Sequence, residues 1–206
     1  NYLFFEGTFF NIMIDNEIVP FEVLGSVFYR NSAKTNRTGF ELGAETAILK
    51  ALVFKFSYTF SSFNYDTYTA RVIKLDNQGN FVTQDKDFSG KIVPSVPKHN
   101  FYFSAAWSKN LTENLTGFVK GSVVHISDMY TDDANSESNP SYTLLNSVLG
   151  LDLKVKNLNF LLSGGVNNIF DTRYAAFLNI NSTSARFYEL GEPRNAFISF
   201  TMGYRF

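Results

Sequence analysis

The last twelve residues of the chain read NAFISFTMGYRF (195–206), and their hydrophobic residues recur at every second position. One face carries Ala196, Ile198, Phe200, Met202, Tyr204 and Phe206, and the other carries Phe197, Ser199, Thr201, Gly203 and Arg205. Successive side chains of a strand point to opposite faces, so this alternation predicts a β-strand with one apolar face. An apolar face that reaches the final aromatic residue requires an apolar partner, either protein or lipid.

The same alternation recurs along the whole chain of 206 residues. It is clearest in the segment 54–61, where Phe54, Phe56, Tyr58 and Phe60 alternate with Lys55, Ser57, Thr59 and Ser61. Further candidate strands cover residues 2–14, 36–48, 100–108, 115–129, 145–155 and 158–167. No segment has helical periodicity, and the 23 Phe and 11 Tyr residues favour strands. The sequence therefore predicts an all-β chain of about eight antiparallel strands.

The links between the candidate strands alternate in length. Short links read LKA (49–51), KNLTEN (109–114) and KN (156–157), whereas long polar links cover 15–35, 74–97, 131–140 and 179–193. Short turns at one end and long loops at the other are typical of a transmembrane β-barrel, and about ten residues cross a bilayer when the strand is tilted. A soluble β-sandwich also alternates, but it has no reason to sort its links by length. We therefore expect an antiparallel transmembrane β-barrel.

Aromatic residues are expected at both ends of these strands. Trp107, Tyr204 and Phe206 fall at the short-turn end, and Tyr130, Tyr142 and Phe170 fall at the long-loop end. Two aromatic girdles at the two membrane interfaces are a property of such barrels. Inward-facing positions are expected for the charged residues Lys55, Lys120, Asp152, Lys154 and Arg205, since a charge facing lipid is costly.

The C-terminal strand resembles the recognition signal of bacterial outer-membrane proteins. That signal is a polar residue, any residue, glycine, a hydrophobic residue, any residue and a final aromatic residue, and it is matched by Thr201, Gly203, Tyr204 and Phe206. The resemblance implies that the barrel-assembly machinery reads this strand during biogenesis and that the protein resides in the bacterial outer membrane. Outer-membrane lipid is then its apolar partner.

Three segments resemble TonB-dependent outer-membrane receptors. Near the C-terminus, the family's Asn-x-Phe-Asp-x-x-Tyr strand end and Gly-x-Pro-Arg turn are matched by Asn168, Phe170, Asp171, Tyr174, Gly191, Pro193 and Arg194. Upstream, an Asn-rich turn before Gly-Phe-Glu-Leu is matched by Asn31, Lys34, Gly39, Phe40, Glu41 and Leu42. The entry to a descending strand is matched by Pro94, Pro97, Lys98 and His99. Each motif is weak alone, but together they occur in the family's order over nearly the whole chain.

This resemblance implies a barrel of 22 strands filled by an N-terminal plug domain. Residues 1–206 would then be its C-terminal portion, with the last eight strands; neither the plug nor the segment that binds TonB is recognisable within them. Eight strands can also close into a small barrel whose interior is filled by side chains. A complete eight-stranded barrel with a structural or interaction role therefore remains the alternative.

The family binds scarce nutrients at the cell surface, and the closing segment resembles receptors for ferric siderophores or similar metal chelates. A receptor that imports glycans or peptides is the alternative, and some such receptors are capped by a surface lipoprotein. Arginine pairs with carboxylates and catecholates, and aromatic rings stack. The candidate ligand-binding residues are therefore Arg173, Tyr174, Arg186, Phe187 and Tyr188.

Other chemistries have weak support in the sequence. His125, Ser127 and Asp128 could suggest a hydrolase, but no oxyanion arrangement accompanies them, so we do not expect an enzyme. The acidic segment with Asp128, Asp132, Asp133 and Glu137 could bind Ca²⁺, although such loops are more often simply hydrated. The chain has no cysteine, so we expect no disulfide, and its net charge of −1 with no basic run predicts no nucleic-acid partner. We also expect no cofactor and no resident metal.

Overall fold

The computed structural model describes residues 1–23, 26–48, 51–182 and 188–206. Its strands are β1 (Tyr2–Val23), β2 (Ser26–Ile48), β3 (Leu52–Thr67), β4 (Thr69–Leu75), β5 (Phe81–Asp87), β6 (His99–Asn110), β7 (Leu115–Ile126), β8 (Met129–Tyr130), β9 (Ser138–Asn139), β10 (Tyr142–Val155), β11 (Leu158–Asn167), β12 (Ala175–Leu178), β13 (Tyr188–Leu190) and β14 (Asn195–Tyr204). No helix among these residues is long and apolar enough to cross a membrane.

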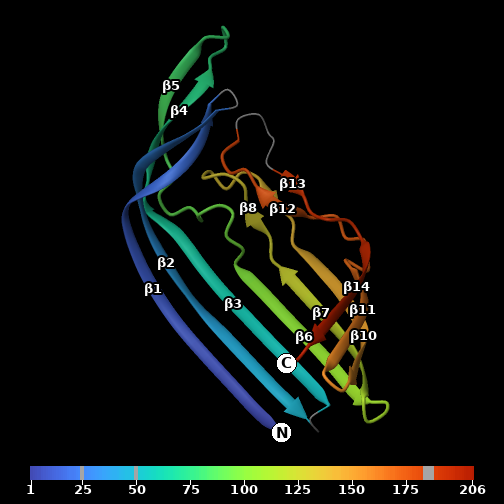
Figure 1. The fold of residues 1–206 in the computed structure, drawn as a ribbon. Helices are drawn as coiled ribbons and strands as arrows, with labels where there is room; N and C mark the ends of the chain where they lie inside the picture. Colours follow the sequence, from blue (N-terminus) through green and yellow to red (C-terminus); the bar gives the residue numbers. More distant parts are fainter. Residues whose placement is uncertain (24–25, 49–50, 183–187) are drawn as a thin grey trace.

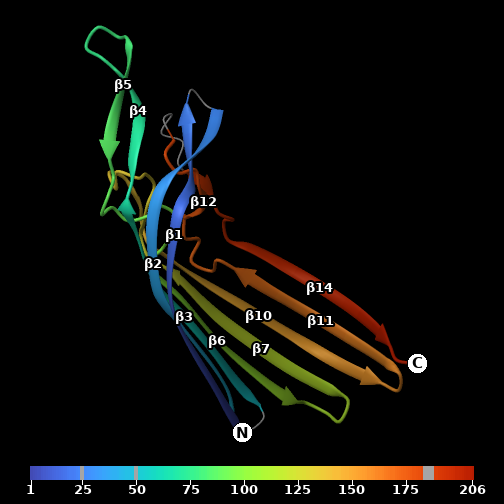
Figure 2. The ribbon, with the colours of Figure 1, turned by 90° about the vertical axis from the view of Figure 1, so that its left-hand side faces the viewer.

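Eight long strands form one antiparallel sheet, as the sequence predicts. Their order is β1-β2-β3-β6-β7-β10-β11-β14, so each long strand pairs with the next long strand along the chain. Figures 1 and 2 show that this sheet follows a curved surface, with β1 and β14 at its two edges. Within the described residues, β1 pairs with β2 and β14 pairs with β11, so the sheet is open.

The two faces of the sheet separate apolar from charged residues. Directly paired residues share a face, and one face carries Leu3, Phe5, Leu42, Phe54, Phe56, Phe103, Trp107, Val119, Leu149, Leu151, Leu153, Phe160, Leu162, Ile198, Phe200 and Met202. Several of these side chains are largely exposed, with Ile198 at 85% and Phe200 at 65%. We call this the apolar face; an exposed apolar surface of this extent fits contact with lipid.

The opposite, polar face carries the charges that were expected to point inward. Pairing places Lys55 opposite Ser104, Lys120 opposite Ala106, and Asp152 opposite Thr116, all on this face. Near the short-turn end, Lys55 Nζ lies 2.8 Å from Glu45 Oε2. Since a lipid-facing Lys or Arg costs about 2–4 kcal/mol near the bilayer midplane, this register is the one that a membrane strand requires.

Glycines on the polar face make room for phenylalanines of the neighbouring strand. Phe118 lies directly opposite Gly150, and a Cβ at Gly150 would lie 2.5 Å from Cζ of Phe118. Gly39 accommodates Phe10 in the same way, and Gly165 accommodates Phe197. An aromatic ring laid across a glycine shields the bare backbone and fixes the register of the pair.

The prediction of a loop over residues 15–35 is wrong. The sequence predicts a polar link over residues 15–35, whereas β1 and β2 continue through it and pair as far as Val23 and Ser26. Register shifts near Glu17, beside Asn16 with its positive φ of 57°, carry the pairing past this polar stretch. Beyond them, Val19 pairs with Arg30 and Phe21 with Phe28, so the hairpin projects beyond the rest of the sheet (Figure 2).

The long links contain additional two-stranded hairpins, which the sequence pattern did not predict. They are β4–β5, β8–β9 and β12–β13. All the long connections lie at one end of the sheet, at the top of Figure 1. The strand pairs β2–β3, β6–β7 and β10–β11 follow one another after only a few residues at the other end, which confirms the predicted sorting of links by length.

Candidate functional site: the cap at the long-loop end

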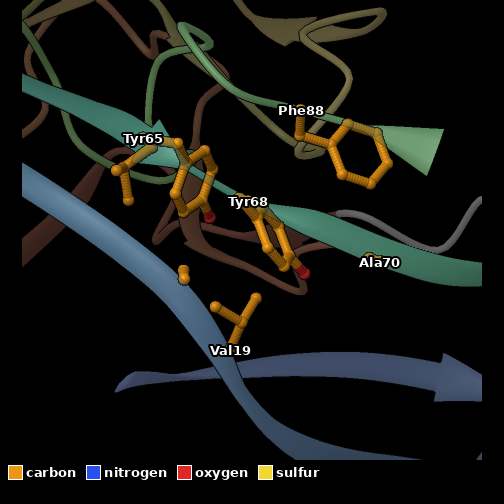
Figure 3. Packing of buried hydrophobic residues seen from close by; sticks show 7 residues of the cluster. Val19, Tyr65, Tyr68, Ala70 and Phe88 are labelled. Carbon is orange, nitrogen blue, oxygen red and sulfur yellow. The ribbon is translucent and has the colours of Figure 1, made fainter. Parts of the chain in front are cut away.

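The main hydrophobic core lies at the long-loop end of the molecule. It is formed by Val19, Ala33, Tyr65, Tyr68, Ala70, Phe88 and Val93 (Figure 3). We call the cap the upper ends of β1, β2 and β3 together with the described parts of the connections 68–98, 127–141 and 168–182. The cap core contains residues from β1, β2, β3 and the connection 68–98, so it joins two consecutive hairpins into one packed unit.

Asp133 is buried at the centre of the cap, where it is 2% exposed. Tyr65 donates a hydrogen bond to Oδ1 of Asp133 at 2.7 Å, and Tyr68 donates one to Oδ2 at 3.1 Å. Nδ2 of Asn181 also donates to Oδ2 of Asp133, at 3.0 Å. Three neutral donors therefore surround a carboxylate that makes no direct ion pair among the described residues.

Arg30 is connected to this carboxylate through the hydroxyl group of Tyr68. Its Nε donates to the hydroxyl oxygen of Tyr68 at 3.1 Å, and its Nη1 donates to the carbonyl of Arg71 at 3.0 Å. Its guanidinium also lies over the ring of Phe21, 4.4 Å from the centroid. Arg30 thus supports Tyr68, links β2 to β4 through its hydrogen bond to Arg71, and links β2 to β1 through its cation–π contact with Phe21.

Burial changes the acidity of the central groups. Burial raises the pKa of Asp133 above its ordinary value, and the hydrogen bonds from Tyr65, Asn181 and Tyr68 oppose this rise only in part. Burial, followed by the nearby Asp133 carboxylate, likewise raises the pKa of Tyr68. The tyrosines therefore stay protonated donors, and the charged form of Asp133 is the costly member of the group.

Glu17 and Arg37 form a second charged group in the cap. Glu17 accepts hydrogen bonds from Thr35 and from Arg37, and Thr35 is fully buried. The guanidinium of Arg37 lies 5.3 Å from the ring centroid of Phe63. This arrangement fixes β1, β2 and β3 to one another at the base of the cap.

The family-like C-terminal motif forms a structural clasp between β11 and β14. Asn168 is buried, accepts from the backbone N of Thr172 at 2.8 Å and donates to the carbonyl of Glu192 at 3.2 Å. The backbone N of Arg194 donates to Oδ1 of Asp171 at 2.8 Å. Asn168 and Asp171 have positive φ values of 50° and 55°, a conformation that Asn and Asp adopt more readily than most residues. These contacts explain why Asn and Asp occur at these positions.

Tyr174 and Gly191 complete this clasp. The ring of Tyr174 lies so close to Gly191 that a Cβ there would be 2.1 Å from its Cζ, and the ring centroid is 4.7 Å from that of Tyr142. The backbone N of Gly191 donates to the carbonyl of Tyr174 at 2.8 Å. Tyr174, a candidate ligand-binding residue, is thus engaged in packing the last connection.

Of the other candidate ligand-binding residues, the structure describes Arg173 and Tyr188. Arg173 is exposed between β11 and β12. Tyr188 is 45% exposed on β13, and its hydroxyl donates to the carbonyl of Ser138 at 3.4 Å. Arg186 and Phe187 lie outside the described residues. Ligand binding by these five residues stays a prediction.

The residues of the candidate hydrolase site and of the acidic segment make separate contacts. His125 Nδ1 lies 2.8 Å from the hydroxyl of Thr143, whereas the Ser127 hydroxyl accepts from the backbone N of His99 and donates to the carbonyl of Asp128. In the acidic segment, Asp132 bonds to Ser136 of its own loop, while Asp133 points into the cap. No group of three or more metal-binding side chains occurs in the part of the chain that the structure describes.

The residues proposed as an assembly signal lie on the edge strand β14 and its end. Thr201 pairs with Leu161 and Gly203 with Asn159. Tyr204 and Phe206 are exposed, and their rings meet edge to face with centroids 5.1 Å apart. The recognition of these residues by an assembly machinery stays a prediction.

The central role of Asp133 and Asn181 was not found from the sequence. Asp133 lies within an apparently hydrated acidic loop, and Asn181 stands out only as an Asn-Ser-Thr triplet. The nearest sequence signal is the pair of tyrosines in the polar stretch 64–69, NYDTYT, because buried tyrosines need hydrogen-bond partners.

Comparison with known proteins agrees with the fold. Residues 1–169 match the family model described as TonB dependent receptor-like, beta-barrel. The ferric yersiniabactin uptake receptor FyuA from Yersinia pestis superposes with a TM-score of 0.72 at 20% identity, over 99% of this chain and 28% of that one. The siderophore receptor PiuA from Acinetobacter baumannii gives 0.69 at 22% identity, over 98% and 26%.

The ferric-catecholate import receptor Fiu from K12 E. coli superposes with a TM-score of 0.63 at 22% identity, over 98% of this chain and 25% of that one. This chain therefore spans about a quarter of the length of each of these receptors. At these identities the structures support the fold, and the family model, which covers most of the chain, supplies the assignment. The chain belongs to the TonB-dependent receptors, outer-membrane proteins of Gram-negative bacteria, and forms part of their β-barrel.

Proposed function

We propose that residues 1–206 are the closing eight strands of a 22-stranded TonB-dependent receptor, the whole of which carries a scarce nutrient across the outer membrane. The observation that supports this most is the open sheet: its edges β1 and β14 are unpaired with each other, as the strands of a larger barrel would be. Transport would then require a plug inside the barrel and contact with TonB through an N-terminal segment.

The proposed cargo is a ferric siderophore or a similar metal chelate. Support comes from the structural neighbours, whose descriptions name siderophore, ferric-catecholate and ferric yersiniabactin receptors. Arg173 and Tyr188 are exposed at the cap end, where an external anionic chelate would arrive. A glycan or peptide cargo, with a surface lipoprotein as accessory partner, is the alternative within the same family.

The first test is the mass of the native polypeptide in purified outer membranes. The 206 residues account for 23.3 kDa, and the proposal expects a band about four times heavier, because this chain spans about a quarter of its structural neighbours. Tryptic peptides of the band should include sequences upstream of Asn1. A native band near 23.3 kDa would contradict the proposal and favour a complete small barrel.

The second test identifies the cargo by measuring nutrient uptake in cells. A strain lacking this protein is compared with its parent for uptake of labelled ferric catecholate, ferric hydroxamate and ferric citrate under iron limitation. The proposal expects loss of at least one of these uptakes, and the same loss in a strain with inactive TonB. Normal iron uptake together with lost uptake of an oligosaccharide or a peptide would favour the alternative cargo.

A further inference from the structure

Asp133 receives its hydrogen bonds from distant parts of the chain. Tyr65 belongs to the end of β3, Tyr68 to the link between β3 and β4, and Asn181 to the connection between β11 and β14. Asp133 itself lies in the connection between β7 and β10. One carboxylate therefore contacts three of the connections or strand ends that form the cap.

Asn181 extends these contacts to the β1–β2 hairpin. Its Nδ2 donates to the carbonyl of Pro20 in β1 at 3.0 Å, and its Oδ1 accepts from the backbone N of Asp133 at 2.9 Å. Its own backbone N donates to the carbonyl of Thr131 at 3.0 Å. Asn181 has a φ of 57°, so the loop is turned to present both its backbone and its side chain to Asp133 and Pro20.

These contacts cross the molecule independently of the sheet. The strand order puts β1, β2 and β3 at one end of the sheet and β11 and β14 at the other. No β-pairing joins those two ends within the described residues, yet Asn181 and Pro20, 161 positions apart, are hydrogen-bonded above it. The bonds of Asp133 and Asn181 thus close the cap over the polar face.

We propose that Asp133 and Asn181 form a latch that holds the four external connections of this chain together as one closed cap over the polar face of the sheet. A buried carboxylate without an ion pair is costly, and its removal takes away the acceptor of two phenols and of one N–H of the Asn181 amide. The cap therefore stays closed while all these hydrogen bonds are formed. Loss of any of the residues that make them releases the connection 168–182.

The latch itself is a property of this chain, whereas its consequence for transport rests on the proposed function. In a receptor, the polar face lines the path of the nutrient, and the cap lies at its external entrance. Opening of the latch would then control entry from outside, and a cap that cannot close would hold the cargo less well.

Hydrogen exchange tests the latch in the intact native polypeptide, embedded in outer-membrane vesicles. The variants are Asp133→Ala and Asn181→Gly; glycine keeps the positive φ and removes only the side chain. Asp132→Ala is the matched control, because the neighbouring carboxylate bonds to Ser136 within its own loop. Heat-modifiable migration on gels verifies that each variant barrel is folded.

The latch predicts that exchange in peptides covering 127–141 and 175–182 rises about tenfold in both variants, while strands β6 and β7 stay protected. A rise no larger than that of Asp132→Ala would overturn the latch. If a variant does not fold, Tyr68→Phe, which removes a single hydroxyl, replaces it and is judged by the same comparison.

Uptake measurements on the same variants separate the two proposals. With the latch and the proposed function both correct, faster exchange accompanies weaker binding of the ferric chelate that the parent strain takes up. Faster exchange in a protein whose deletion leaves every tested nutrient uptake unchanged would support the latch and contradict the proposed function. Unchanged exchange in a protein that does transport a nutrient would support the proposed function and contradict the latch.

Discussion

Asp133 illustrates how a buried charge is tolerated in a loop region. The carboxylate accepts three hydrogen bonds, and Arg30 contributes through Tyr68 without touching it. The charged and titratable groups around it are Tyr65 and Tyr68, Arg30 on β2 and Glu17 on β1, with Asp132 as its neighbour in the chain. Burial outweighs these contacts, so the pKa of Asp133 is raised.

This raised pKa predicts that acid tightens the cap. A carboxyl whose folded pKa is raised contributes stability that is complete below its unfolded pKa and is lost as pH rises through its folded pKa. Protection of the 127–141 peptide, corrected for intrinsic exchange rates, should therefore increase as pH falls from 7 toward 4. Asp133→Asn removes the titration and should flatten this profile, whereas Asp132→Asn should leave it unchanged. A wild-type profile as flat as that of Asp133→Asn would contradict the assignment.

The sequence could not identify these residues, because their roles depend on partners that are distant in the sequence. Asp133 meets Tyr68 across 65 positions and Asn181 across 48. A carboxylate in a polar loop is normally hydrated, and nothing local distinguishes Asp133, which is buried, from Asp132, which bonds within its own loop. The family-like motif was visible in the sequence, but the reason for Asn168 and Asp171, a clasp between β11 and β14, was not.

At the level of the elements, the sheet follows from alternation. Leu151 and Leu162 are paired on the apolar face, while Asp152 and Leu161 are paired on the polar face. The alternation predicted all eight long strands, and their observed register puts every predicted inward charge that lies within a strand on the polar face. Strand ends were less predictable, as β1 and β2 show, because pairing across a bulge continues through residues of low strand preference.

Arginine substitutions on the two faces of one strand pair test this register. Leu151→Arg should lower the stability of the barrel by about 2–4 kcal/mol near the bilayer midplane, because the charge would face lipid. Leu161→Arg is the matched control, since it lies directly opposite Asp152, whose buried Oδ1 has no hydrogen-bond partner among the described residues. The folded fraction on gels across a urea series measures both. Equal loss in the two variants would contradict the assignment of the faces.

At the scale of the whole molecule, the sheet formed by the described residues has two free edges, and β14 is the one at the C-terminal end. A strand with unpaired backbone groups and an exposed apolar face can be captured by strand addition, which is the physical basis of the proposed assembly signal. Tyr204 and Phe206 lie at its end with exposed rings.

Phe206→Ala tests that signal. The substitution removes the final aromatic ring without changing a described hydrogen bond, so it should reduce the amount of folded protein in the outer membrane several-fold and leave the urea midpoint of the folded fraction nearly unchanged. Phe170→Ala, which removes an exposed aromatic residue at the other end, is the control. An unchanged folded amount in Phe206→Ala would contradict a role of this residue in assembly.

The sequence by itself determined the strands, the face that each side chain occupies, the sorting of links by length and the resemblance to the family. These are local properties, because a period of two residues and a turn depend on neighbours in the chain. Only the tertiary structure decided that β1 and β2 run past their predicted ends and that long loops pack as one cap. Those outcomes depend on contacts such as Asn181 with Pro20, across 161 positions, which no local pattern encodes.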